Sequence, residues 1–206
     1  MKRVTRSISQ VKPVLWGCST NAIAVWHTPH MGLSASPFSF RDQLAFYGAY
    51  HTNRVNVGIH ILCVPLIWVS TLGLVLQSGV SVTALVTQMP SVVRSPALHG
   101  LGELQSIVPA YVYPHLNVAS LVSFLYLMYY YVLDIPSALL ITPLWAGYYA
   151  LAWVGAEVLQ GRSGPLLAVF VLSWLLQFYG HGVHEGRAPA LLDNLLGAVV
   201  LAPLFV

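Results

Sequence analysis

Four long stretches of this chain carry no charged residue, and short polar segments separate them. They run from Val55 to Val93, from Leu104 to Leu133, from Ile135 to Ala156 and from Ser163 to His184. A helix that crosses a bilayer needs about 20 mostly apolar residues, so each stretch can supply one. We therefore predict an all-α fold, a polytopic membrane helix bundle with about four transmembrane helices, at residues 57–77, 116–133, 136–158 and 165–182.

The segments between and around these spans predict further helices. Residues 38–50 place apolar side chains at a spacing of three to four, which is typical of an amphipathic helix at a membrane interface. Residues 190–206 are apolar but interrupted by Asp193 and Asn194, and we expect an interfacial or re-entrant helix packed on the bundle. We interpret residues 79–115 as an insertion, a loop with helical pieces.

The amino-acid composition supports an integral membrane protein. Of the 206 residues, 57% are hydrophobic and only 7% are charged, whereas a soluble domain has about 25% charged residues. So few charges cannot cover a surface that faces water. The sequence contains no basic patch with interleaved aromatic residues, so we expect membrane lipid around the chain and no nucleic acid partner.

Residues 1–40 differ in composition from the rest. They hold four Lys or Arg, no Asp or Glu, and many Ser and Thr. Such a composition fits a mitochondrial transit peptide and also a disordered cytosolic tail, and we favour the tail. The membrane domain is expected at residues 41–206.

The distribution of positive charge predicts the orientation of the bundle. With four spans, the side of the N-terminus collects seven Lys and Arg residues, and the opposite side collects Arg94 and Arg162. The positive-inside rule then places the N-terminus in the cytosol. An even number of spans also returns the fourth span to the face where the first began. His51 and His60 therefore come to the same membrane face as His181.

Histidines gather at those two rims. His60 lies inside the first span, where a histidine is a functional-site hypothesis by default. His181 and Glu185 are four residues apart, so a helix places them on one face, and His184 also faces that way. His51 lies nine residues before His60, half a turn out of phase in a continuous helix. Both can bind one ion only if the chain breaks between them.

Other polar residues and glycines can support such a site. Asn53 and Asn56 offer caps for the helix that follows, which allows the break, and they are candidates for contacts with the metal or its ligands. Asp193 either caps the last helix or orients a ligating histidine. Gly180 and Gly182 weaken a helix but permit close approach of the backbone to a ligand.

Imidazoles and a carboxylate together suit Fe, Zn or Mn. Such a cluster can bind non-haem iron for oxygen chemistry, zinc for hydrolysis, or form a proton path in a transporter. Its position at a rim disfavours the transporter, because transporter sites lie near the bilayer midplane. The remaining alternative is a non-catalytic membrane scaffold in which the histidines satisfy one another.

Two motifs of the chain resemble those of the fungal 2-hydroxy fatty acid dioxygenase family. The opening motif is Phe46-Tyr47 … His51-x-Asn53-x-x-Asn56-x-x-x-His60 … Pro65. The closing motif is Gln177-Phe178-x-Gly180-His181-Gly182-x-x-Glu185-x-Arg187-x-Pro189-Ala190-Leu191-x-Asp193-Asn194-Leu195 … Leu201-Ala202-Pro203. The resemblance covers residues 41–77 and 116–206 and leaves out the insertion.

The resemblance implies a small multi-spanning enzyme of the endoplasmic reticulum membrane. Members of that family use Fe(II) and O₂ to shorten 2-hydroxy fatty acids by one carbon, an α-oxidation in the degradation of phytosphingosine. It further implies that His51, His60 and His181 hold the iron and that Glu185 belongs to the catalytic set. A zinc-dependent lipid hydrolase and the scaffold stay as alternatives.

The chain also departs from the family's pattern. Thr52 stands where close relatives often carry a second histidine, and His184 stands where an aromatic residue is usual. His184 is therefore a candidate to compensate for the missing histidine. We expect the acyl tail of the substrate between helices, beside the aromatic residues Phe124, Tyr126, Tyr129, Trp145 and Trp174.

Overall fold

The computed structural model describes residues 36–109, 111–186 and 197–206. Regular structure within these residues is helical, and the one extended pairing described is an isolated bridge between Ser81 and Asn117. The predicted all-α class is therefore confirmed for the part of the chain that the structure describes.

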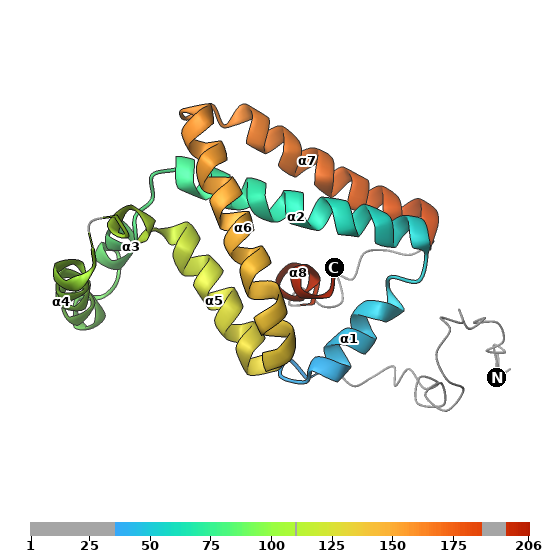
Figure 1. Ribbon diagram of the computed structural model, residues 1–206, viewed down its shortest axis with the longest axis horizontal. Helices are drawn as coiled ribbons and strands as arrows, with labels where there is room; N and C mark the ends of the chain where they lie inside the picture. The colour runs from blue at the N-terminus through green and yellow to red at the C-terminus, as the bar shows by residue number, and fades with distance from the viewer. Residues whose placement is uncertain (1–35, 110, 187–196) are drawn as a thin grey trace, which may run out of the picture. The chain divides into compact units, whose positions relative to one another are not determined.

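Figure 1 shows the order of the helices along the chain. They are α1 (Phe40–Ala49), α2 (Arg54–Gln77), α3 (Val82–Thr87), α4 (Ser91–Ile107), η2 (Tyr113–His115), α5 (Val118–Leu133), α6 (Ile135–Leu159), α7 (Gly164–Tyr179), η3 (Gly180–Glu185), η5 (Gly197–Leu201) and α8 (Ala202–Phe205). The segments η3 and η5 are π-helical, and η3 continues α7 directly.

Three helical stretches are long and apolar enough to cross a membrane. They are Arg54–Gln77, Ile135–Leu159 and Gly164–Glu185. The span expected at 116–133 forms α5, which has 16 residues and reaches about 24 Å at 1.5 Å per residue. This helix is shorter than the roughly 20 residues that a span needs. The structure thus supports three spans and a shorter apolar helix, and the expected count of four is not confirmed.

Local chemistry explains where the long helices begin and end. The side chain of Asn53 accepts a hydrogen bond from the Val55 backbone N–H at 2.9 Å and caps α2. Asp134 ends α5 and caps α6, since its carboxylate accepts from the Ser137 N–H at 2.9 Å. Gln160, with φ 47°, and Gly161, with φ 81°, make the left-handed turn that ends α6.

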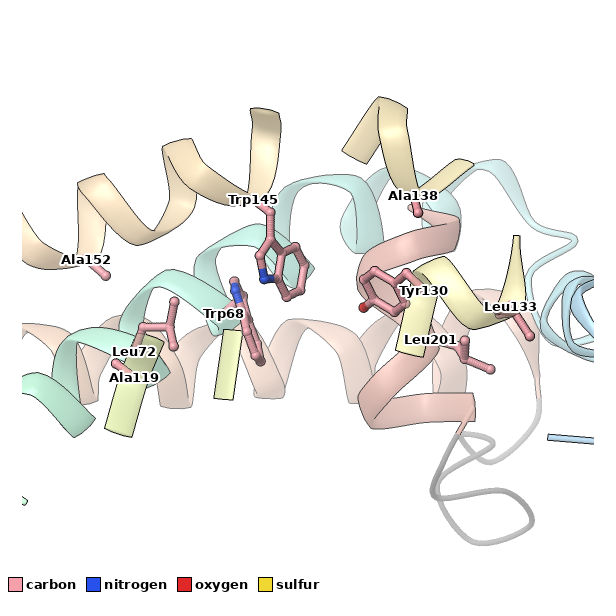
Figure 2. Packing of buried hydrophobic residues seen from close by; sticks show 9 residues of the cluster. All are labelled: Trp68, Leu72, Ala119, Tyr130, Leu133, Ala138, Trp145, Ala152 and Leu201. Atoms are coloured by element: carbon pink, nitrogen blue, oxygen red, sulfur yellow. The ribbon is translucent and has the colours of Figure 1, made fainter. Parts of the chain in front are cut away.

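Buried aromatic rings join α2, α5 and α6 (Figure 2). Trp68 and Trp145 have ring centroids 4.6 Å apart, and Tyr130 lies 5.5 Å from Trp145. The Trp145 indole N–H donates to the Ser123 carbonyl at 3.2 Å, and the Tyr130 hydroxyl donates to the Val200 carbonyl at 2.6 Å. The polar tips of Trp145 and Tyr130 thus have partners, whereas the buried Trp68 Nε1 has none among the described residues. The bond from Tyr130 also ties the C-terminal segment η5 to the same core.

The long helices α2 and α7 lie side by side (Figure 1). Gly73 permits this approach, because a Cβ there would stand 3.0 Å from Leu166 Cδ1. The insertion contains α3 and α4, as expected for a loop with helical pieces. The predicted C-terminal helix is described only from residue 197, where η5 and α8 pack on the bundle and Leu201 is fully buried.

We predict that Trp145→Ala lowers the free energy of unfolding by about 3–5 kcal/mol, because the surrounding rings cannot fill the cavity. Thermal unfolding in detergent measures the change. Leu140→Ala on the same helix is the control, since the Leu140 side chain is 80% exposed. Equal loss of stability in the two variants would contradict the position of the core.

Candidate metal centre

The helix is interrupted between α1 and α2, and this interruption brings His51 back over His60. The segment from Tyr50 to Asn53 leaves the helical path, and His51 lies within it. The two imidazole ring centroids are 4.5 Å apart. The break that the nine-residue spacing required is therefore present.

His181, near the end of the α7–η3 stretch, completes a group of three histidines. Its ring centroid lies 5.0 Å from that of His51 and 4.8 Å from that of His60. One nitrogen from each ring lies within 4.8 Å of the other two. Two imidazole nitrogens on one zinc-like ion are at most about 4.2 Å apart. The three nitrogens therefore lie near the spacing that one ion requires, and the rings would have to move closer together to bind it.

Hydrogen bonds orient two of the three rings. Nδ1 of His51 donates to the Tyr47 carbonyl at 2.7 Å, and Nδ1 of His60 donates to the Asn56 carbonyl at 2.9 Å. Because a carbonyl can only accept, both rings carry the proton on Nδ1 and keep a free lone pair on Nε2. This backbone support is typical of metal-ligating histidines.

Buried lone pairs without partners mark the inside of the group. His51 Nε2 and His181 Nδ1 are buried and have no hydrogen-bond partner among the described residues. A buried polar atom without a partner is costly, and a bound cation would remove that cost. The residues present therefore fit a metal ion held by three imidazoles.

The surroundings of His51 keep its ring neutral. Burial lowers the pKa of His51 below its ordinary value, and this effect exceeds the opposing effects of the Tyr47 carbonyl and the Glu185 charge. The Tyr47 ring stacks on the His51 imidazole with centroids 3.9 Å apart and 14° between the planes. A neutral imidazole is the form that binds a metal.

Glu185 joins the end of η3 to the start of α2. One carboxylate oxygen accepts from the Thr52 N–H at 2.9 Å and from the Thr52 hydroxyl, and the other accepts from the Asn53 N–H at 3.0 Å and the Asn56 amide at 3.1 Å. A carboxylate at a helix N-terminus is also favoured by the helix dipole. Glu185 thus holds the segment that carries His51, and it lies outside the three-histidine group.

A cavity of about 270 Å³ opens from the three histidines. Along α2 its lining extends from His60 to Thr71, and along α7 from His181 back to Phe170, which is about 16 Å on each helix. The walls between are largely apolar, with side chains that include Phe46, Val64, Ile67, Trp68, Tyr126 and Trp174. The candidate metal group therefore stands at one end of an elongated apolar cavity.

Comparisons with known proteins agree with this geometry. A family described as 2-hydroxy-palmitic acid dioxygenase Mpo1-like matches residues 38–206. The 2-hydroxy-palmitic acid dioxygenase MPO1 of Saccharomyces cerevisiae is 34% identical over 170 residues, which cover 81% of this chain and 76% of the yeast protein. The chain belongs to the Mpo1-like family. No solved structure matches it.

Within this Mpo1-like chain, Gly180 is required by a close approach of α7 to α2. A Cβ at Gly180 would stand 2.5 Å from Asn56 Oδ1 and 3.2 Å from Ile59 Cδ1. We expected Asn56 to cap α2, but it lies inside the helix and is fully buried. We expected Gly180 to let the backbone approach a ligand closely. In the structure it lets the backbone approach α2.

The remaining predicted site residues lie beside the histidine group or outside the described residues. His184 contacts the Tyr179 ring, with centroids 5.2 Å apart, and lies outside the group of three. The wider π turn of η3 gives a reason, because it changes which residues lie one turn below His181. Asp193 lies outside the described residues.

The sequence analysis assigned no role in the site to two residues that shape it. Tyr47 supports and stacks on His51, and its position four residues earlier, one helical turn, was the available signal. Thr52 was noted as a departure from the family, yet both its N–H and its hydroxyl donate to Glu185. Of the five aromatic residues expected at the acyl tail, Tyr126 and Trp174 line the cavity, and Phe124, Tyr129 and Trp145 do not.

We predict that Gly180→Ala reduces the metal content of the purified protein, because the new methyl group forces Asn56 and the start of α2 away. Gly182→Ala is the matched control, since nothing lies within 4 Å of a Cβ there. Replacing glycine by alanine in a helix otherwise stabilises by about 1 kcal/mol. If both variants retain the wild-type metal content, the close contact between α2 and α7 does not govern the site.

Proposed function

We propose that this chain is an Fe(II)-dependent dioxygenase that shortens 2-hydroxy fatty acids by one carbon. The observation that carries the proposal is the position of three histidines, the half-buried His51 and the buried His60 and His181, at the end of an elongated apolar cavity. A fatty acid has the matching shape, with one polar end and a long apolar tail. The yeast relative is a 2-hydroxy-palmitic acid dioxygenase, which supports the same substrate class.

His51, His60 and His181 would hold the iron. Bound iron would supply the one-electron chemistry that O₂ needs to react with a closed-shell organic acid. The chain itself supplies neutral imidazoles of fixed orientation, through the hydrogen bonds to the Tyr47 and Asn56 carbonyls. Its apolar cavity holds the acyl tail and excludes water from the reacting end.

We further propose the cellular setting that the family resemblance implies. The chain would be a multi-pass protein of the endoplasmic reticulum membrane with its N-terminus in the cytosol, acting on 2-hydroxy acids released from phytosphingosine. Residues 41–206 would form the dioxygenase domain, with residues 79–115 as an insertion and residues 1–40 as a tail.

The donor set also fits zinc, because three histidines and an open position are a known catalytic zinc arrangement. A zinc hydrolase would act without O₂, so oxygen dependence separates the two functions. The scaffold alternative has less support, since histidines that satisfied one another would not leave His51 Nε2 and His181 Nδ1 buried without partners.

Anaerobic reconstitution tests the proposed function. Purified protein is loaded with Fe(II) without oxygen, and then receives 2-hydroxyhexadecanoic acid and O₂. We expect a product one carbon shorter, no turnover without O₂, and no turnover with Zn²⁺ in place of Fe(II). Turnover with Zn²⁺ and no O₂ would favour the hydrolase, and the absence of stoichiometric iron would favour the scaffold.

Variants of the histidines locate the activity. We expect His51→Ala, His60→Ala and His181→Ala each to abolish iron binding and turnover while the protein still inserts into membranes. His184→Phe is the matched control and should keep substantial activity, because His184 contacts Tyr179 and not the group of three. Loss of iron in His184→Phe as complete as in His181→Ala would assign His184 to the metal.

Glu185→Gln tests the support of the site. The NH₂ group of glutamine replaces one carboxylate oxygen and cannot accept a hydrogen bond. The variant therefore loses either the hydrogen bonds from Thr52 or those from Asn53 and Asn56. We expect iron affinity to fall by about 10- to 100-fold without disappearing, as for other residues that orient a ligand. Glu157→Gln, at an exposed glutamate of α6, is the control in the Fe(II) titration. Complete loss of iron in Glu185→Gln would make Glu185 a direct ligand.

A further inference from the structure

Among the residues that the structure describes, the helix α4 presents apolar side chains that no other element covers. It packs on α3, and the Arg94 guanidinium donates to the Thr87 carbonyl at 3.4 Å. Yet Val93, Leu104 and Ile107 keep 49%, 39% and 76% of their surface exposed. In Figure 1 the two helices stand apart from α6 and α7.

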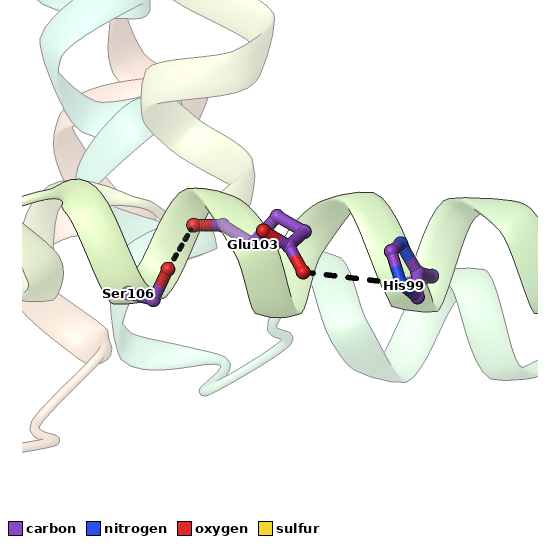
Figure 3. A network of polar contacts seen from close by, with 3 residues as sticks. All are labelled: His99, Glu103 and Ser106. Carbon is purple, nitrogen blue, oxygen red and sulfur yellow. Dashed lines mark hydrogen bonds and ion pairs between the residues drawn. The ribbon is translucent and has the colours of Figure 1, made fainter.

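The polar residues of α4 lie on the other side of the same helix. Figure 3 shows His99, Glu103 and Ser106 along one face, where His99 Nε2 and Glu103 Oε1 are 3.8 Å apart and the Ser106 hydroxyl donates to the Glu103 carbonyl at 2.7 Å. At 100° per residue, Val93 and Leu104 fall about 120° to 160° from His99 and Ser106, and Ile107 falls about 80° to 100° from them, at the edge of the same apolar arc. The helix is therefore amphipathic, with two faces that can be tested separately.

The chain leaves and re-enters the bundle at one place. The bridge between Ser81 and Asn117 joins the start of α3 to the start of α5. The preceding helix α2 is long and apolar enough to span a membrane, and α5 exposes apolar side chains such as Phe124 at 58% and Val132 at 64%. Because both neighbours carry apolar outer surfaces, α3 and α4 are placed at the bilayer surface where α2 ends.

We propose that α4 lies in the plane of the lipid bilayer surface, with Leu104 and Ile107 among the acyl chains and His99 and Ser106 toward water. An amphipathic helix of this kind binds a membrane through its buried apolar area and through any basic residues. The one Arg and one Glu of α4 balance each other. The partner is therefore the apolar boundary of a neutral bilayer, and anionic lipid is not required. This placement does not depend on iron or on turnover.

Site-directed spin labelling tests the placement. Single cysteines replace Leu104, Ile107, His99 or Ser106 in a full-length chain without Cys18 and Cys63, reconstituted in phosphatidylcholine nanodiscs. Power saturation compares O₂, which concentrates in the bilayer, with a nickel chelate that stays in water. We expect the ratio of oxygen to nickel accessibility to be several-fold higher at Leu104 and Ile107 than at His99 and Ser106.

Two other results would overturn the proposal. Equal nickel accessibility on both faces would show that α4 stands in water. Shielding of Leu104 and Ile107 from both reagents would show that protein, such as a second copy of this chain, covers the face. As a second variant, Leu104→Glu combined with Ile107→Glu should make a label at Val93 accessible to nickel, whereas Ser106→Glu should leave that label unchanged. No gain at Val93 in the double variant also contradicts insertion.

Discussion

The Glu185 carboxylate is the interaction on which the site depends. It lies at the end of η3, and it accepts hydrogen bonds from the backbone of Thr52 and Asn53 and from the side chains of Thr52 and Asn56. The two segments that meet there are 129 to 133 residues apart in sequence, and this carboxylate joins the segment before α2 to the end of η3. A charge-assisted hydrogen bond is about twice as strong as a neutral one, and here several converge on one group.

The metal group and the cavity follow from that constraint. Once the break is held, His51 folds back over His60, and the packing of α2 on α7 brings His181 to both. Gly180 makes the packing close enough. The cavity then extends from the histidines along both helices between largely apolar walls, so the polar group of three histidines ends an apolar cavity. That combination supports the proposal of a lipid-directed oxygenase over a scaffold.

The sequence predicted the long helices from their apolar lengths. It predicted the meeting of the histidines from an even number of spans, a count that the structure does not confirm. The roles of individual residues could not be predicted in the same way. Asn56 has the character of a helix cap but is buried inside α2, and this depends on how closely α7 approaches. His184 shares a face with His181 only in a regular α-helix, and the π turn of η3 removes that relation. The helix predicted at 116–133 agrees with α5 to two residues, and it begins at Val118 because Asn117 caps it.

The central claim is that one ion is held by His51, His60 and His181, and X-ray absorption spectroscopy of the Fe(II)-loaded protein tests it most directly. The extended X-ray absorption fine structure identifies imidazole ligands, because the outer atoms of each ring scatter the photoelectron in a characteristic way. The account predicts three imidazoles on one iron per chain, with one fewer in each single histidine variant that still retains metal. A spectrum without imidazole scattering, or one unchanged by replacing His181, would contradict it.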